Sequence, residues 1–464
     1  MNGPTTTPDV RAHARGVAPL DARLEPWMAE LAADHERCAA LLAEFGSPVN
    51  VLHTGAFTRN GRELIDAGTR AGVTVRPFFA RKANKALAFV DAARDAGFGV
   101  DVASLAELSQ VLDRGVPGAD IVVSAAVKSP ELLELAIRSG AVISLDNRTE
   151  LAAVVGTAAR LGTRARVCPR LAVSPDVVPP TRFGERLDVW RALAGELVAA
   201  LSVEGVHVHL HGYAAADRVA ALGEVLELAD ALTAAGAPLR FVDLGGGIPM
   251  SYLESAAQWD GFWAAHRAAL EAGEPLTWKG WELNTVYPYW QRPVRGGWLD
   301  DLLAGALPDG TRAARALAAR GLELRLEPGR SLLDGCGTTL AEVVFTKERS
   351  DGVPLVGVAM NRTQCRSTSE DFMVDPLLVP ARGRAAEPYE GYLVGAYCIE
   401  DEIILARRIA FPGGVAPGDV LAIPNTGGYL MHIVESASHQ LPLAKNVVLD
   451  GPGGVARLDA IDAR

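Results

Sequence analysis

Lysine is scarce in this chain, and one lysine follows a segment that reads as a buried strand. The six lysines stand at positions 82, 85, 128, 279, 347 and 445. Lys82 lies in FFARKAN, directly after the apolar run 75–80. Burial at a strand end lowers the pKa of a lysine and lets its amine attack a carbonyl to form a Schiff base. The alternative is an ordinary solvated lysine.

Three histidines alternate with apolar residues in GVHVHLH, at positions 207, 209 and 211. Alternation along a strand places all three side chains on one face. Neighbours on that face are about 6.5 Å apart, too far for all three to bind one ion. We therefore expect no metal site, and interpret one of these rings as a platform for a planar cofactor ring.

Two further strand ends carry groups suited to an anionic ligand. Gly245, Gly246 and Gly247 follow LRFVDL, and consecutive glycines let backbone amides approach a phosphate. Glu327 and Arg330 follow LELRL in the turn EPGRS. A carboxylate suits a pyridinium nitrogen, and a guanidinium suits a phosphate or carboxylate. The alternative is an exposed ion pair. Taken with Lys82 and a stacking histidine, these groups indicate a pyridoxal phosphate site.

The elements that must position these residues alternate along the chain. Short apolar runs that read as strands are separated by stretches with helical periodicity, and the runs cover 75–80, 98–102, 121–125, 141–145, 164–172, 205–211, 239–244 and 322–327. Eight strands with intervening helices predict an α/β fold, a (β/α)8 barrel, whose functional residues lie at the carboxyl ends of the strands. An open doubly wound sheet is the rival arrangement.

Three segments do not fit the repeat. The connection before the eighth run holds an insertion at about 252–300 with six of the eight tryptophans, either a small core of its own or a wall over the barrel mouth. After residue 335 the pattern becomes strands and turns, with runs at 338–348, 353–360, 389–398, 402–411, 418–425, 428–436 and 446–450. We predict a lead-in and helix at 1–45 associated with this β domain, a barrel at 46–334 and a C-terminal β-sandwich or β-barrel domain at 335–464.

Composition narrows the classes of partner. Basic residues number 45 and acidic residues 56, and the net charge of −11 argues against nucleic acid as a ligand. The five cysteines are far apart and include no CxxC, which indicates a reducing compartment, so we expect a cytoplasmic protein. No apolar run is long enough for a membrane span, and the N-terminus does not look like a secretory signal. The expected partner is a small molecule.

Seven motifs in order resemble those of the fold-type III pyridoxal-phosphate-dependent decarboxylases, the diaminopimelate and ornithine/arginine decarboxylase family. In chain order, the motifs of this sequence are FGSPVNVLH, FFARKAN, FGVDVASLAEL, TRFG, GVHVHL, DLGGGIP and EPGRS. The corresponding family motifs are FGTPLYVYD, YAVKAN, GFDVASxxEL, SKFG, GLHFHI, DLGGGF and EPGRS. The resemblance covers about residues 45 to 450, and its fold is an alanine-racemase-like barrel with a C-terminal β domain.

The resemblance implies roles for individual residues. Lys82 corresponds to the lysine that carries the cofactor, His209 to the stacking ring, Glu327 to the partner of the pyridine nitrogen and Arg330 to a phosphate or carboxylate ligand. GAYCIEDEIILA is similar to a segment whose cysteine enters the partner subunit's site, which implies a catalytic role for Cys398 and a homodimer. NTGGYL is similar to the segment whose tyrosine contacts the phosphate, which implies Tyr429.

Departures from the family pattern concern the substrate. Where the family usually has an acid after the cysteine, this chain has Ile399, followed by Glu400. Strand alternation would turn Glu400 away from Ile399. Arg330, Arg366 and His211 are the other candidate substrate-binding residues. We therefore predict a decarboxylase for an amino acid other than a simple diamine acid, with an acidic, conjugated or apolar distal end.

Three alternatives remain open at the level of sequence. Decarboxylative condensation or another carbon–carbon reaction would use the same cofactor. A racemase or epimerase of this fold typically has an arginine at the ring nitrogen, where this chain has Glu327. A pyridoxal phosphate carrier without turnover would keep Lys82 but would not need Glu327 and Cys398.

Overall fold

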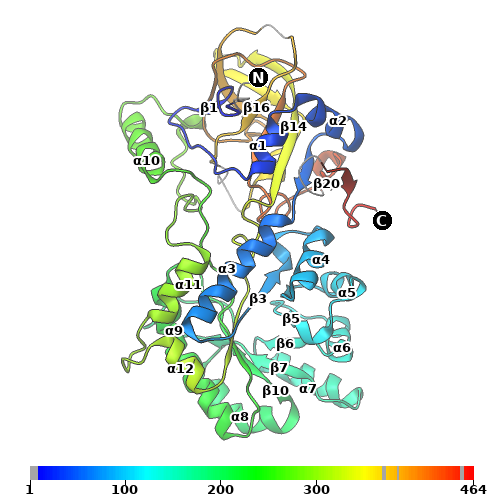
Figure 1. Cartoon of the computed structure of the whole chain (residues 1–464), viewed down its shortest axis with the longest axis vertical. Coiled ribbons are helices and arrows are strands. Elements are labelled where there is room, and N and C mark those ends of the chain that lie inside the picture. Colours follow the sequence, from blue (N-terminus) through cyan, green and yellow to red (C-terminus); the bar gives the residue numbers. More distant parts are fainter. Residues whose placement is uncertain (1–8, 368–372, 384–385, 450–453, 464) are drawn as a thin grey trace, which may run out of the picture.

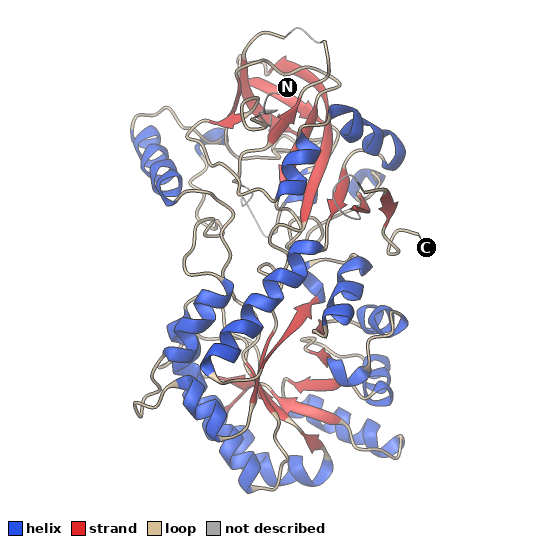
Figure 2. Cartoon of the chain, viewed as in Figure 1, coloured by secondary structure: helices blue, strands red, loops and turns tan. Residues whose placement is uncertain are grey.

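The structure, a computed structural model, describes residues 9–367, 373–383, 386–449 and 454–463. Two bodies of regular structure are stacked along the long axis of the molecule (Figure 1). Helices surround the strands of one body, whereas the other consists mainly of strands (Figure 2). Among the described residues, no helix combines the length and the apolar character that crossing a membrane requires.

The first body is a barrel of parallel strands. Its eight principal strands are β3 (Val75–Ala80), β4 (Gly99–Val102), β5 (Ile121–Val123), β6 (Val142–Leu145), β7 (Arg166–Pro169), β11 (Gly205–His207), β12 (Phe241–Asp243) and β13 (Glu323–Leu326). They pair in this order from β3 to β7, and from β11 through β12 and β13 back to β3. A parallel bridge between Arg170 and His207 joins β7 to β11. The predicted (β/α)8 barrel is therefore confirmed, and the open sheet is excluded.

Helices and short elements connect these strands. They are α3 (Gly55–Ala71), η1 (Arg81–Ala83), α4 (Leu87–Ala96), α5 (Leu105–Asp113), η2 (Gly118–Asp120), α6 (Pro130–Ser139), α7 (Arg148–Arg160), β8 (Leu171–Ala172), β9 (Glu185–Arg186), α8 (Leu187–Ala200), β10 (Ser202–Val203), α9 (Ala215–Ala234), α11 (Arg295–Ala304) and α12 (Ala313–Ala319).

Local sequence fixes where several of these helices begin and end. Ser129 accepts a hydrogen bond from the backbone of Leu132, and Asn147 accepts one from Glu150, so both act as N-caps. Gly97 and Gly140 end α4 and α6 with a φ of 74°, a conformation that favours glycine. These short, well-capped helices return the chain to each next strand.

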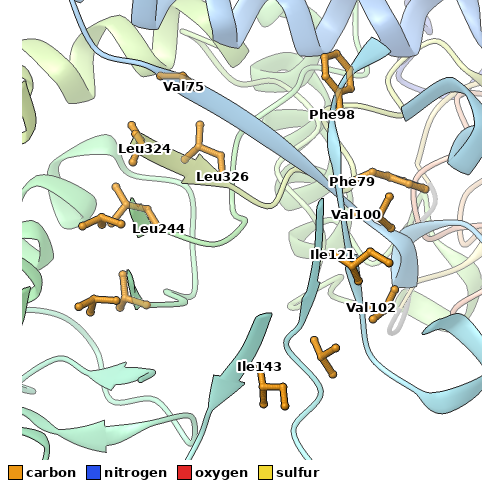
Figure 3. Close-up of a cluster of buried hydrophobic side chains, with 14 of the residues drawn as sticks. Val75, Phe79, Phe98, Val100, Val102, Ile121, Ile143, Leu244, Leu324 and Leu326 are labelled. Atoms are coloured by element: carbon orange, nitrogen blue, oxygen red, sulfur yellow. The ribbon is translucent and has the colours of Figure 1, made fainter. Parts of the chain in front are cut away.

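Branched and aromatic side chains fill the layer between the barrel strands and the helices around them; Phe79, for example, packs against Phe57 of α3 and Phe89 of α4. Val75, Phe79, Val100, Leu324 and Leu326 project from neighbouring strands (Figure 3). Phe79, Val100 and Leu324 are completely buried. This apolar packing holds the strands in register, so that residues just after their carboxyl ends converge at one end of the barrel.

The second body is a β domain with two helices on one side. Its strands are β1 (Arg15–Gly16), β2 (Val49–Leu52), β14 (Gly337–Glu348), β15 (Pro354–Val358), β16 (Leu377–Val379), β17 (Tyr389–Val394), β18 (Ile409–Phe411), β19 (Val420–Pro424), β20 (Lys445–Leu449) and β21 (Ala456–Leu458). The long strand β14 pairs with β2 and β19 over its first half and with β15 over its second half. The helices α1 (Pro26–Ala32) and α2 (His35–Phe45) share an apolar cluster with β16 and β19.

Three features of the β domain differ from the sequence-based expectation. β2 pairs with β14 and β20, so Val49–Leu52 belongs to this domain although we expected it in the barrel. Within 402–411, only Ile409–Phe411 forms a strand. The predicted strand at 428–436 is wrong, because this segment is a series of turns and Tyr429 has a φ of 70°.

The inserted segment contains α10 (Ala256–Glu271) and η3 (Trp278–Gly280). Its apolar residues share a cluster with the β domain, among them Phe262, Leu283 and Tyr289. Thr277 forms an antiparallel bridge with Arg407. α11, at the end of the predicted insertion, instead packs against α3 and α9 as a helix of the barrel.

Candidate active site

A cavity of about 690 Å³ opens where the carboxyl ends of the barrel strands meet the β domain. Eight residues singled out from the sequence line it, namely Lys82, His209, His211, Gly246, Gly247, Glu327, Arg330 and Tyr429. Lys82 follows β3, Glu327 follows β13, and Tyr429 comes from the β domain. The structure thus brings together groups that are up to about 350 residues apart in the chain.

The amine of Lys82 is held by a carboxylate of the next strand. Lys82 Nζ lies 2.5 Å from Asp101 Oδ2, and its side chain is 33% exposed, toward the cavity it lines. Removal from water lowers the pKa of Lys82, but the carboxylates of Asp101 and Glu327 outweigh this effect and raise it above its usual value. The predicted lowering of this pKa is therefore wrong for the ion-paired amine.

The carboxyl group of Glu327 is buried at the floor of the cavity. Its Oε1 atom lies 3.6 Å from Nε2 of His207, and neither atom has a hydrogen-bond partner among the described residues. Burial raises the pKa of Glu327 well above its usual value, and the carboxylates of Asp101 and Asp243 raise it further. A cationic ring nitrogen placed here would relieve this cost.

His209 and the glycine loop form the wall beside Lys82. Burial lowers the pKa of His209 to about 3, with Lys82 and Arg170 acting in the same direction, so its ring is neutral at pH 7. The backbone N–H of Gly246 donates to its Nδ1 over 3.4 Å. A Cβ atom on Gly246 would lie 3.0 Å from the Glu327 carbonyl oxygen and 3.6 Å from His209 Cε1. Glycine at position 246 therefore lets the loop pack closely against the end of β13 and the ring of His209.

Arg330 is surrounded by tyrosines rather than by carboxylates. Its Nη1 donates to the Tyr252 hydroxyl over 2.8 Å, and its guanidinium carbon lies 4.3 Å from the ring centroid of Tyr287 and 5.1 Å from that of Tyr429. Within the part of the chain that the structure describes, Arg330 forms no ion pair. A cation in this position is suited to an anionic group of a ligand.

Several predicted site residues lie elsewhere. Cys398, Ile399 and Glu400 are all exposed and do not line the cavity of their own chain. They follow β17 in a series of bends, so the expected alternation of Ile399 and Glu400 along a strand is wrong. Arg366 donates to the Ile403 carbonyl over 2.8 Å instead of lining the cavity. Residues 368–372, which follow shortly after Arg366, lie outside the described residues.

The inserted segment contributes to the cavity through Thr285, Val286, Tyr287 and Pro288. None of its tryptophans lines the cavity; Trp278, for example, packs against Tyr392 in the β domain. Different residues of the same segment therefore form part of an apolar core and part of the cavity wall.

Sequence reasoning missed three groups around the site. Asp101 was visible as a charged residue inside an otherwise apolar strand, but its pairing with Lys82 was not. Arg218 is completely buried and donates to the carbonyls of Leu210, Gly212 and Gly246, which ties the glycine loop to α9. Tyr252 gave no signal, because a tyrosine in an insertion is equally typical of a core.

One grouping resembles a metal site. Ligand atoms of His207, His209 and Glu327 all lie within 4.8 Å of one another. Three histidines of one strand lie too far apart to bind one ion, but in this set a glutamate from another strand takes the place of the third histidine.

These residues also fit a pyridine ring that carries an aldehyde and a phosphate, as in pyridoxal phosphate. Lys82 offers the amine, Glu327 a buried carboxyl group for the ring nitrogen, and His209 a neutral ring. The glycine loop, Arg330 and Tyr429 offer donors for a phosphate.

Comparison with known proteins agrees with this fit. Residues 62–274 match the family described as pyridoxal-dependent decarboxylase, pyridoxal binding domain. An uncharacterised protein, y4yA, of Sinorhizobium fredii is 31% identical over 411 residues, covering 86% of this chain and 87% of that protein. A diaminopimelate decarboxylase of Pseudomonas aeruginosa is 28% identical, covering 91% of this chain and 92% of that protein.

Solved structures show the same fold. A diaminopimelate decarboxylase of M. jannaschii in complex with L-lysine superposes with a TM-score of 0.70 at 22% identity, covering 90% of each chain. An arginine decarboxylase of Paramecium bursaria Chlorella virus gives a TM-score of 0.63 at 16% identity, covering 89% of this chain and 98% of that chain.

Proposed function

Since the chain belongs to the fold-type III pyridoxal-phosphate-dependent decarboxylases, and is thus an amino-acid decarboxylase, we propose that its substrate is an amino acid other than a simple diamine acid such as ornithine or lysine. The observation that carries this proposal is the chemistry of the cavity wall. Among the described residues that line the cavity, Glu327 is the one carboxylate, and it lies at the buried floor. Burying an ammonium group without a carboxylate partner costs several kcal/mol.

The rest of the wall supports an anionic, bulky or apolar distal group. Arg330 offers a positive charge held by Tyr252, and Val286 and Tyr287 offer apolar surface from the insertion. The residue after Cys398, where the family usually has an acid, is Ile399. A substrate with a second carboxylate or a conjugated side chain would match these groups best.

Each residue near the cofactor receives a role in this proposal. Lys82 would carry the cofactor through Nζ, His209 would lie against its ring, Glu327 would hold a proton at the ring nitrogen, and Gly246, Gly247 and Tyr429 would bind its phosphate. When bound, pyridoxal phosphate supplies an electron sink for the electron pair that carbon dioxide leaves behind. Lys82 Nζ, or Sγ of a second subunit's Cys398, then returns a proton to the substrate's α carbon.

We further propose that the active form is a homodimer. Cys398 is exposed at the surface of its own chain and does not line its own cavity. A residue with this placement can complete a site only in a neighbouring copy, which a two-fold interface would allow.

A substrate panel tests the proposed specificity. Values of kcat/KM for carbon dioxide release would be measured for ornithine, lysine, arginine, diaminopimelate, and acidic and conjugated amino acids. We expect kcat/KM for the acidic or conjugated compounds to exceed kcat/KM for ornithine and lysine by at least about 100-fold. Such a ratio corresponds to the cost of several kcal/mol for burying an ammonium group without a partner. Turnover of L-ornithine or L-lysine near 10⁴ M⁻¹s⁻¹, about the lower end of the range typical of enzymes on their own substrates, would show that Glu400, Asp401 or the insertion replaces the missing acid.

A further inference from the structure

The ring of His207 is enclosed by groups that can fix the position of its proton. It is completely buried at the end of β11. Ser144 Oγ lies 2.6 Å from its Nδ1, and Arg170 Nε donates to the same nitrogen over 3.2 Å. Its Nε2, on the other side of the ring, faces Glu327 Oε1 at 3.6 Å.

Arg170 cannot turn away from this ring without losing other bonds. Its Nη1 lies 2.9 Å from Asp146 Oδ1, and its Nη2 donates to the Ser124 carbonyl over 2.6 Å. The guanidinium side chain is 4% exposed. An arginine side chain only donates hydrogen bonds, so Nδ1 of His207 must present its lone pair to Arg170.

A neutral imidazole carries one proton, and with Nδ1 acting as acceptor that proton lies on Nε2. The doubly protonated ring is disfavoured, because burial and the charge of Arg170 lower the pKa of His207 well below 6.5. Ser144 then completes the arrangement by donating its hydroxyl proton to Nδ1. With its proton on Nε2, His207 has no lone pair there for a metal ion, which argues against the grouping with His209 and Glu327 as a metal site.

We infer that Arg170 fixes His207 as the Nε2–H tautomer and that His207 directs this proton at Oε1 of Glu327, acting as a positioning residue for the ring-nitrogen site. The inference rests on the proposed role of Glu327. With Oε1 facing a donor, Oε2 remains available to accept from a protonated ring nitrogen. If Glu327 itself carried a proton, that proton would have to lie on Oε2. Oε2 could then no longer readily accept a hydrogen bond from the protonated ring nitrogen.

The tautomer can be measured without any turnover. ¹⁵N NMR of the cofactor-free protein, with labelled histidine and assignment by His207→Gln, should show a protonated Nε2 and an unprotonated Nδ1 for His207. Ser144→Ala should leave this pattern unchanged, and Arg170→Gln should populate the other tautomer. A protonated Nδ1 in the wild-type protein would overturn the inference.

Cofactor affinity tests the connection to Glu327. His207→Leu should weaken binding of pyridoxal phosphate about tenfold or more, the effect expected if the Nε2–H of His207 donates a hydrogen bond to Oε1 of Glu327 once the cofactor is bound. It should not weaken binding of the deaza analogue, which has carbon in place of the ring nitrogen. His207→Gln, which retains a donor, should restore most of the affinity. Equal losses for both cofactors would indicate a merely structural role for His207.

These readouts separate the inference from the proposed function. If Glu327→Gln binds pyridoxal phosphate as tightly as the wild type while the NMR pattern holds, the assignment of Glu327 to the ring nitrogen fails but the tautomer of His207 stands. The substrate panel has no bearing on either measurement.

Discussion

Among the lysines near the barrel ends, Lys82 alone faces the cavity. Lys85 forms an ion pair with Glu435, and the side chain of Lys128 is completely buried and paired with Glu150. Lys82 is also paired, but its partner Asp101 leaves the amine within the cavity, next to Glu327. We propose that this difference in surroundings makes Lys82 the reactive amine and leaves Lys85 and Lys128 structural.

The first prediction follows from that difference. Borohydride reduction of the protein with bound pyridoxal phosphate, followed by proteolysis and peptide mapping, should place the pyridoxyl group on Lys82. Lys82→Ala should lose the label and the activity, whereas Lys85→Ala should retain both. A pyridoxyl group found on Lys85 or Lys128 would contradict the assignment.

The candidate site was predictable from sequence where each residue carried its own local signal. Lys82, His209 and Glu327 each follow an apolar run, and barrel topology alone brings such positions together. Asp101 and His207 acquire their meaning from partners on other strands, and no spacing in the chain reveals those pairs. The expectation of a lowered pKa for Lys82 considered burial alone, since the sequence does not reveal that Asp101 is its ion-pair partner.

At the scale of elements, the inserted segment serves two purposes with different residues. Trp278 is 3% exposed, packs edge-on against Tyr392 and donates its indole N–H to Asp401 over 2.8 Å. Val286, eight residues further on, lines the cavity. The segment therefore fastens itself to the β domain through Trp278 and reaches the cavity through 285–288.

A matched pair of variants separates these purposes. Trp278→Ala should lower the free energy of unfolding by about 3–5 kcal/mol, as for loss of a large buried side chain, with kcat/KM little changed. Val286→Ala should cost less than about 1.5 kcal/mol in stability, because the side chain is only partly buried, yet change KM for the preferred substrate several-fold. Chemical denaturation and steady-state kinetics would measure both. Equal loss of stability with unchanged KM would mean that the whole segment is core.

The fold was predictable where one local pattern recurs, and less so in the β domain. Stretches with helical periodicity separate the eight barrel strands, which fixes their order and direction. β2 is buried on both faces, so its composition fits either body, and its partners β14 and β20 lie nearly 300 and 400 residues away in the chain. The segment 428–436 contains apolar residues such as Leu430 and Met431, which are buried although they lie in turns. In the sequence, such apolar residues resemble those of a strand.

At the scale of the whole molecule, a partly buried histidine joins the barrel to the β domain. The backbone N–H of Lys85 donates to His432 Nδ1 over 3.2 Å, and His432 Nε2 lies 2.9 Å from Asn446 Oδ1. Burial and the charge of Lys85 lower the pKa of His432 to about 3. The folded chain therefore resists protonation of this ring, whereas the unfolded chain takes up the proton near pH 6.5.

This difference predicts an acid-sensitive junction. The stability that a neutral His432 provides is complete above about pH 6.5 and is lost as the pH falls toward 3. Between pH 7 and pH 5, the wild type should lose about 2 kcal/mol more free energy of unfolding than His432→Gln, which does not titrate. Urea denaturation of both proteins at the two pH values would measure the difference. Equal pH dependence would mean that the ring is protonated in the folded chain.

The last prediction concerns sites shared between two copies of the chain. If Cys398 completes the cavity of a partner, a heterodimer of Lys82→Ala and Cys398→Ala chains contains one site with both changes and one site with neither. Random mixing makes half of the dimers heterodimers, so activity should recover to about a quarter of the wild-type value. The two variants would be unfolded, mixed and refolded together, and heterodimers would be counted by native mass spectrometry. Because each parent dimer is defective at both sites, any recovery must come from the unaltered site. If heterodimers form and the activity stays at the level of the parents, Cys398 acts within its own chain or not at all, and the cavity must be complete in a single subunit.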